Sequence, residues 1–173
     1  MAHEMTGAAR TLFDFTHAAA VAGWSAIDDR VMGGVSQSGL RHDAAGHAVF
    51  AGTVSLERNG GFASVRASAQ DVQAPGAGRY RLDVRGDGRR YKLTLRTDDA
   101  FDAVSYQAEF APVAGQWTRV ELPLSAFAPS FRGRSVPGAP PLDPGRVRQV
   151  GLMIADGQAG DFALALRAIA AAP

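Results

Sequence analysis

The chain contains no cysteine among its 173 residues. This absence excludes disulfide bonds, thiolate nucleophiles and zinc–thiolate sites, and it permits a reducing compartment. An excess of one charge is also missing, since 18 Lys and Arg residues balance 17 Asp and Glu residues to a formal net charge of +1. Proteins that bind polyanions carry a strong basic excess, so we expect no nucleic-acid partner.

Long apolar runs are absent as well. No stretch approaches the roughly 20 apolar residues that a membrane-spanning helix needs, so we expect no membrane span. The first residues, MAHEMTG, include an early glutamate and predict neither a secretory signal nor an arginine-rich mitochondrial presequence. We therefore expect a cytoplasmic protein. The content of 46% hydrophobic and 20% charged residues is typical of a folded domain, and we expect residues 1–173 to form one domain.

Hydrophobic and polar residues alternate along most of the chain, whereas helical spacing is scarce. Tyr80, Leu82 and Val84, for example, alternate with charged residues. Half-buried antiparallel strands produce this period of two. Many short strands separated by Gly and Pro predict an all-β protein, built as an antiparallel sandwich or barrel. The same alternation marks residues 50–56, 91–95, 106–110, 120–124, 150–154 and 162–166.

Two dipeptides are typical of two-residue β-hairpin turns. The Asn-Gly pair at 59–60 would place Val54 opposite Val65, with apolar side chains on one shared face. The Asp-Gly pair at 87–88 would place Val84 opposite Tyr91 in the same way. Turn chemistry and hydrophobic pattern agree at both places, so we predict two hairpins.

The second predicted hairpin gathers basic residues. Residues 79–96 include seven basic and two acidic residues, a net charge of +5, so the remainder of the chain carries −4. In the predicted register Arg85 faces Arg90, and like charges that face each other across strands are destabilising. An anionic partner would explain this arrangement, because arginine binds carboxylate and phosphate groups in a bidentate way. The alternative is that Glu109 and Glu121, on neighbouring strands, neutralise these arginines.

The segment WSAIDDRVMGGVSQSG, residues 24–39, contains the adjacent carboxylates of Asp28 and Asp29. Paired carboxylates bind calcium or act as acid and base in some proteins. However, this pair lacks the spaced oxygen ligands of a dedicated calcium loop, and the acidic group at 98–102 is equally unspecific. We expect the two carboxylates to accept hydrogen bonds from backbone amides of their loop.

Catalytic motifs are not found. The four histidines have no metal-ligand spacing, and we expect His47 to be exposed beside a loop. Ser36 lacks the second glycine of a nucleophile elbow, and the glycines at 86–88 lack the third glycine of a dinucleotide-binding fingerprint. We therefore predict no catalytic residue, no metal site, no cofactor and no enzymatic activity.

Several short blocks follow one another along the chain. They are VMGGVS at 31–36, NGGFASVR at 59–66, RGDGRRY at 85–91, YQAEF at 106–110, LPLSAF at 122–127, FRGR at 131–134, PLD at 141–143 and GDF at 160–162. In this order the blocks resemble those of the complex I intermediate-associated protein 30 family. The resemblance runs from about residue 13 to residue 169 and implies a jelly-roll β-sandwich of the galactose-binding-like class. Members of that family include a mitochondrial assembly factor for respiratory complex I, and relatives that join the domain to a dehydrogenase-like domain.

Together with the missing catalytic motifs, the resemblance predicts a non-enzymatic binding module. Its expected partner is a protein, a respiratory-complex subunit or a dehydrogenase-like protein, in an assembly or chaperone-like role related to complex I. The alternative is a carbohydrate-binding module with a sugar ligand. We expect loops and one sheet face to form a polar, arginine-rich binding surface. Its predicted residues are Asp28, Asp29, Arg30, Asn59, Arg66, Arg85, Asp87, Arg89, Arg90, Arg132 and Arg134.

Overall fold

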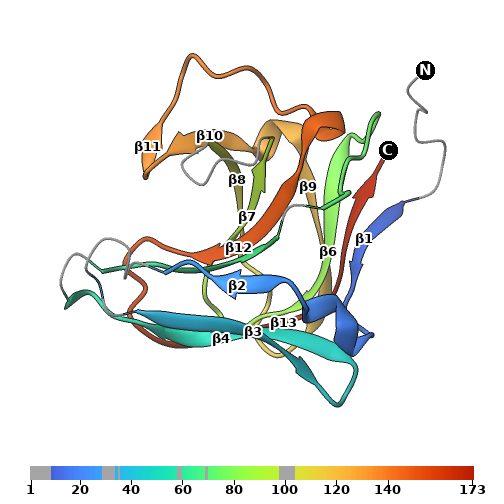
Figure 1. The fold of residues 1–173 in the computed structure, drawn as a ribbon. Helices are drawn as coiled ribbons and strands as arrows, with labels where there is room; N and C mark the ends of the chain where they lie inside the picture. The colour runs from blue at the N-terminus through green and yellow to red at the C-terminus, as the bar shows by residue number, and fades with distance from the viewer. Residues whose placement is uncertain (1–8, 29–33, 35, 58–59, 69, 98–103) are drawn as a thin grey trace.

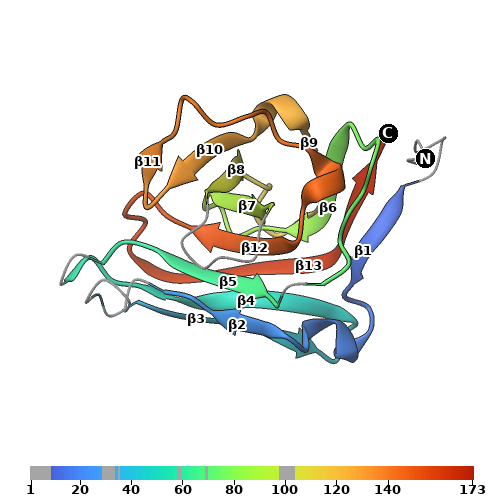
Figure 2. The same cartoon turned by 45° about the horizontal axis from the view of Figure 1, so that its top comes forward.

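Two antiparallel β-sheets, packed face to face, form the protein (Figures 1 and 2). This arrangement confirms the predicted all-β sandwich. In Figure 2, β12 and β5 of one sheet lie over β13 and β4 of the other. The computed structural model describes residues 9–28, 34, 36–57, 60–68, 70–97 and 104–173.

The six-stranded sheet has the order β3-β4-β13-β6-β9, and β1 pairs with β13 beside this path. One edge of β13 pairs with β4 along its first part and with β1 along its last part, while its other edge pairs with β6. β13 therefore lies at the centre of this sheet. The strands are β1 (Arg10–Asp14), β3 (Gln37–Asp43), β4 (His47–Val54), β6 (Arg79–Arg85), β9 (Trp117–Pro123) and β13 (Gly160–Ala172).

The seven-stranded sheet has the order β11-β10-β8-β7-β12-β5-β2. Its strands are β2 (Trp24–Ala26), β5 (Ala63–Ala67), β7 (Tyr91–Arg96), β8 (Ser105–Phe110), β10 (Ala128–Phe131), β11 (Arg134–Ser135) and β12 (Gln149–Ile154). Three short 3₁₀ helices complete the described elements, namely η1 (Ala18–Val21), η4 (Leu124–Ala126) and η5 (Pro144–Arg146). No helix in the described part of the chain is long and apolar enough to span a membrane.

The core lies between the sheets and follows the alternation seen in the sequence. On β6, Leu82 and Val84 are fully buried, while Asp83 between them is partly exposed. The ring of Phe50 packs edge-on against Phe162 at 4.9 Å and against Tyr91 at 6.2 Å, which joins the two sheets. Aromatic contacts of this geometry stabilise a core beyond the area they bury.

The hairpin predicted at 59–60 is wrong. β4 and β5 belong to different sheets, so Val54 lies opposite Gly160, and Val65 lies between Ala26 and Leu152. The amide of residue 60 donates to the carbonyl of residue 57 at 2.9 Å. β4 and β5 nevertheless do not pair with each other, and the chain passes from one sheet to the other between them.

The hairpin predicted at 87–88 is wrong for the same reason. β6 pairs with β13 and β9, whereas β7 pairs with β12 and β8. Arg85 therefore lies opposite Trp117 and Ala165, and it does not face Arg90. Both inner faces of a sandwich turn toward one core, so the apolar pattern of a strand fits either sheet. Alternation identifies the buried face of a strand but not its partner.

Candidate binding surface

The basic residues of the predicted hairpin do not form one surface. Arg79 and Arg81, on β6, bind Glu121 on β9 with N–O distances of 3.1 and 2.7 Å. Hydrogen bonds from Arg81 and then Arg79 hold the pKa of Glu121 below its usual value. On the other sheet, Arg90 lies 3.6 Å from Glu109. The alternative considered above, neutralisation by Glu109 and Glu121, is confirmed for these three arginines.

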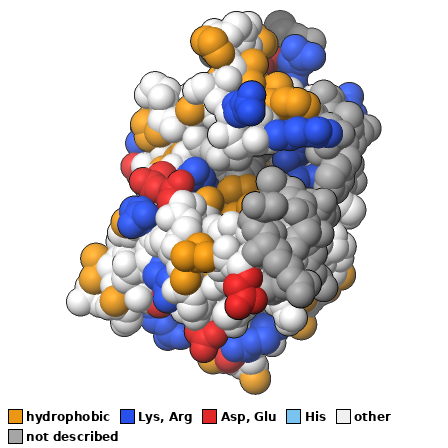
Figure 3. All heavy atoms as spheres, turned by 90° about the vertical axis from the view of Figure 1, so that its left-hand side faces the viewer, with side chains coloured by type: hydrophobic (Ala, Val, Ile, Leu, Met, Phe, Trp, Pro, Cys, Tyr) orange, Lys and Arg blue, Asp and Glu red, His pale blue; other side chains and the backbone are white. Residues whose placement is uncertain are grey.

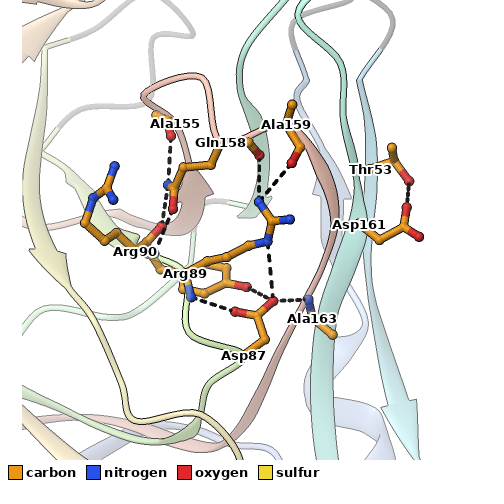
Figure 4. Close-up of polar contacts among 10 residues, drawn as sticks. Thr53, Asp87, Arg89, Arg90, Ala155, Gln158, Ala159, Asp161 and Ala163 are labelled. Atoms are coloured by element: carbon orange, nitrogen blue, oxygen red, sulfur yellow. Dashed lines mark hydrogen bonds and ion pairs between the residues drawn. The ribbon is translucent and has the colours of Figure 1, made fainter.

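Hydrogen bonds of Asp87 and Arg89 connect the two sheets (Figure 4). The carboxylate of Asp87 accepts hydrogen bonds from the Tyr91 hydroxyl at 2.9 Å, the Ala163 amide at 2.8 Å and the Arg89 amide at 3.1 Å. The Arg89 guanidinium donates to the carbonyls of residues 158 and 159 at 3.0 and 3.1 Å. Both side chains thus join the segment between β6 and β7 to β13 and to the connection that precedes β13.

Asp28 is an internal anchor. It is 3% exposed, and its carboxylate accepts hydrogen bonds from the Ser38 hydroxyl at 2.5 Å, the Ser38 amide at 3.0 Å and the Ser64 amide at 3.0 Å. It therefore fastens the chain after β2 to β3 and β5. The expectation that this carboxylate satisfies backbone amides is confirmed for Asp28. Its neighbours Asp29 and Arg30 lie outside the described residues.

Arg66 projects from β5 on the outer face of the seven-stranded sheet, since its neighbours Val65 and Ala67 point into the core. Burial, together with the positive charge of Arg96 on β7, lowers the pKa of Arg66 to about 10. Arg66 stays protonated at neutral pH. Two guanidinium groups thus lie near each other in a partly desolvated place.

A row of small and polar residues that includes Arg66 crosses this outer face, two positions along β7 from Arg96. In register, Ser25, Arg66, Gly151, Thr94 and Gln107 lie on five adjacent strands from β2 to β8. A Cβ atom at Gly151 would lie 2.5 Å from the Thr94 hydroxyl oxygen, so the middle of the row accepts no larger residue. We call these five residues the polar row.

Arg132 and Arg134 belong to the β10–β11 hairpin at the edge of the same sheet. The turn consists of Arg132 and Gly133, with φ of 50° and 78°, and positive φ at both residues is typical of a tight hairpin. The Arg132 guanidinium lies 5.4 Å from the ring of Phe131, which is 38% exposed. Figure 3 shows Lys and Arg side chains gathered at the height that β10 and β11 occupy in Figure 1.

A second cluster, which the sequence did not predict, surrounds Trp117 on the outer face of the six-stranded sheet. The guanidinium carbons of Arg167 and Arg85 lie 3.8 and 5.2 Å from the centre of the Trp117 ring. The imidazole of His47 packs edge-on against the same ring at 5.4 Å. His47 is 7% exposed, so the expected exposure is wrong. Four different strands supply these residues, and only their register brings them together.

Among the residues that the structure describes, no group of three or more His, Cys, Asp or Glu side chains is placed to hold a metal ion. The acidic group at 98–102 lies outside that part of the chain, as does Asn59.

The sequence profile described as Complex I intermediate-associated protein 30 (CIA30) matches residues 13–166, from β1 to β13. The chain belongs to the CIA30 family. An uncharacterized protein of the fission yeast Schizosaccharomyces pombe is 33% identical over 171 aligned residues. That alignment covers 86% of this chain and 77% of the yeast protein.

Solved structures with a similar fold include carbohydrate-binding modules. The CIA30 chain superposes on the family 11 module of the Clostridium thermocellum cellulase Lic26A-Cel5E with a TM-score of 0.69 and 16% identity, over 96% of this chain and 95% of that one. The same module in complex with a β-1,3-1,4-mixed-linked tetrasaccharide also gives 0.69, over 99% and 97% of the two chains. A family 29 module mutant gives 0.53 at 11% identity, over 96% and 92%. At such low identities these likenesses show the fold alone.

Proposed function

We propose that this chain is a non-catalytic binding module that holds a protein partner on the outer face of its seven-stranded sheet. The observation that carries the proposal is the partly buried Arg66 beside Arg96 on that face. Guanidinium groups in a desolvated place favour a carboxylate, which they bind with paired hydrogen bonds. The polar row provides further donors and acceptors beside them.

The proposed partner presents an acidic segment. The family description names a protein associated with complex I intermediates, which supports a respiratory-complex subunit, or a dehydrogenase-like protein, as the partner. An assembly or chaperone-like role follows from that choice. Of the residues predicted from the sequence, the arginines on or beside the seven-stranded sheet enter the proposed surface, namely Arg66, Arg90, Arg132 and Arg134.

Site-specific cross-linking tests this proposal. A photoreactive amino acid in place of Gln107, which is partly exposed in the polar row, is expected to form adducts with an acidic protein in the native cell. The same amino acid in place of Thr53, exposed on the opposite sheet, is the matched control and is expected to form none of these adducts. Mass spectrometry of the adducts identifies the partner.

Charge reversal adds a second arm to this experiment. Changing Arg132→Glu and Arg134→Glu together is expected to reduce the Gln107 adducts by about tenfold, because like charges across an interface are repulsive. Adducts that form equally from the Gln107 and Thr53 positions, or that survive the charge reversal unchanged, would contradict the proposed surface.

A carbohydrate-binding module is the second candidate, because the fold is that of sugar-binding proteins. Sugar sites use exposed aromatic rings as platforms. Tyr80, Tyr91 and Tyr106 are at most 3% exposed here, and the ring of Trp117 is already stacked against Arg167. We therefore expect calorimetry with a mixed-linked β-glucan tetrasaccharide to show no saturable binding. Saturable binding that is lost on changing Phe131→Ala, at the most exposed aromatic ring described, would favour the sugar instead.

A further inference from the structure

The Trp117 cluster lies in a regular position across the six-stranded sheet. In register, Arg41, Val49, Ala165, Arg85 and Trp117 form a row over β3, β4, β13, β6 and β9. Val49 and Ala165 point away from the core cluster, yet they are only 6% and 5% exposed. Neighbouring side chains therefore cover Val49 and Ala165, which form a small apolar patch on this outer face.

Arg167 reaches the same place through an irregularity in β13. The pairing of β13 with β6 shifts between residues 166 and 168, so Arg167 occupies a β-bulge. Bulges commonly redirect a side chain. The guanidinium carbons of Arg167 and Arg85 lie 3.8 and 5.2 Å from one ring centre, so they are no more than about 9 Å apart. The two guanidinium groups therefore lie on one patch of the outer face, beside the same ring.

The two guanidinium groups differ from the other arginines of this face. Arg79 and Arg81 bind Glu121, and Arg119 lies 3.6 Å from Asp83. Within the described residues, the side chains of Arg85 and Arg167 form no ion pair and no hydrogen bond, and their contact is the Trp117 ring. Each guanidinium carries five N–H donors. Stacking orients these donors before a ligand arrives, which lowers the entropic cost of binding.

We infer that Arg85 and Arg167, held against Trp117, form a binding site for a phosphate group. Two positive charges match a phosphate dianion better than a single carboxylate, and guanidinium groups bind phosphate oxygens in a bidentate way. The site lies on the sheet opposite the proposed protein-binding face, so it does not depend on that function. Free phosphate and a phosphate monoester share the chemistry required, and separate titrations distinguish them.

Fluorescence of Trp117 provides the test. The chain has two tryptophans, so changing Trp24→Phe leaves Trp117 as the only reporter. Inorganic phosphate and O-phosphoserine, titrated at constant ionic strength, are each expected to give a saturable change, and sodium chloride none. Binding of both ligands assigns the site to monoesters, and binding of inorganic phosphate alone assigns it to the free anion.

Matched double variants separate a site from general surface charge. Changing Arg85→Gln and Arg167→Gln together is expected to weaken phosphate binding by about tenfold for each lost guanidinium. Changing Arg79→Gln and Arg119→Gln removes the same charge from the same face, and the expected change is less than about twofold. Equal effects of the two pairs, or no saturable change in the parent, would overturn the inference. The exposed Arg167→Gln alone serves if the double variant does not fold.

His47 provides an independent readout. Burial lowers the pKa of His47; the charge of Asp43 on β3 raises it, and Arg85, Arg167 and Arg41 lower it further. A phosphate dianion beside the cluster would offset those positive charges. Saturating phosphate is therefore expected to raise the His47 pKa measured by NMR, and the Arg85→Gln, Arg167→Gln variant should lose that rise. A purely structural cluster would show the same His47 pKa with and without phosphate.

Discussion

Replacing Asp28 with alanine is expected to lower the free energy of unfolding by about 3 kcal/mol. Three hydrogen bonds are lost at once: the amides of Ser38 and Ser64 lose their acceptor, and the Ser38 hydroxyl keeps only the Ser64 carbonyl at 3.2 Å. Buried donors without partners cost more than the hydrogen bonds themselves contribute, because water cannot reach them. Urea unfolding measures the change as a lower midpoint with an unchanged slope.

A matched control exists on the other sheet. Asp161 is exposed and accepts one hydrogen bond, from the Thr53 hydroxyl at 2.7 Å (Figure 4). Changing Asp161→Ala is expected to cost less than about 1 kcal/mol. If Asp28→Ala cost no more than this control, Asp28 would not be the anchor that its geometry indicates. A loss of partner binding at unchanged stability would instead assign Asp28 to the binding surface.

Replacing Asp87 with alanine is expected to cost about 3 kcal/mol as well. The variant leaves the hydroxyl of the fully buried Tyr91 and the amide of Ala163 without their acceptor. It also removes the negative charge that lies 4.0 Å from the Arg89 guanidinium. The two sheets would lose a connection at the segment where the chain crosses between them, and thermal unfolding should show a lower midpoint.

Asp83 is the control for this second variant. It lies on β6, and its carboxylate is 3.6 Å from Arg119 in a pair that is largely exposed. Exposed pairs contribute little, so Asp83→Ala should change stability by about 0.5 kcal/mol or less. Tyr91→Phe removes one of the Asp87 partners and should cost about 1 kcal/mol. An equal loss of unfolding free energy for Asp83→Ala and Asp87→Ala would show that the hydrogen bonds of Asp87 do not stabilise the contact between the sheets.

The positions of the strands could be predicted from the sequence, but their partners could not. Leu82 on β6 and Leu93 on β7 are fully buried, as their alternation predicted. Yet the predicted hairpin between these strands does not exist, because Leu82 lies between Ile169 and Val120. Local turn chemistry at 87–88 suits a crossing as well as a hairpin. The deciding hydrogen bond, from the distant amide of Ala163, has no signal in the local sequence.

In the candidate surfaces, too, some contacts could be predicted from the sequence and others could not. Neutralisation of Arg81 by Glu121 could be proposed, because both belong to recognisable strands and carry opposite charge. The contact of Arg167 with Trp117 could not, since it needs the order of three strands and a bulge in one of them. Asp28 was correctly expected to bind backbone amides, although the sequence did not reveal that one of them belongs to Ser64 on another strand.

The central place of β13 has a consequence for synthesis of the chain. β4, β6 and β1 all form hydrogen bonds with β13, yet each of them is translated at least 74 residues earlier than Gly160 begins it. While the ribosome makes residues 86–159, these three strands have edges whose shared neighbour does not yet exist. Strands with unpaired edges pair readily with other chains. The edges of β1, β4 and β6 that pair with β13 in the folded protein therefore stay without their native neighbour until residues 160–172 have been made.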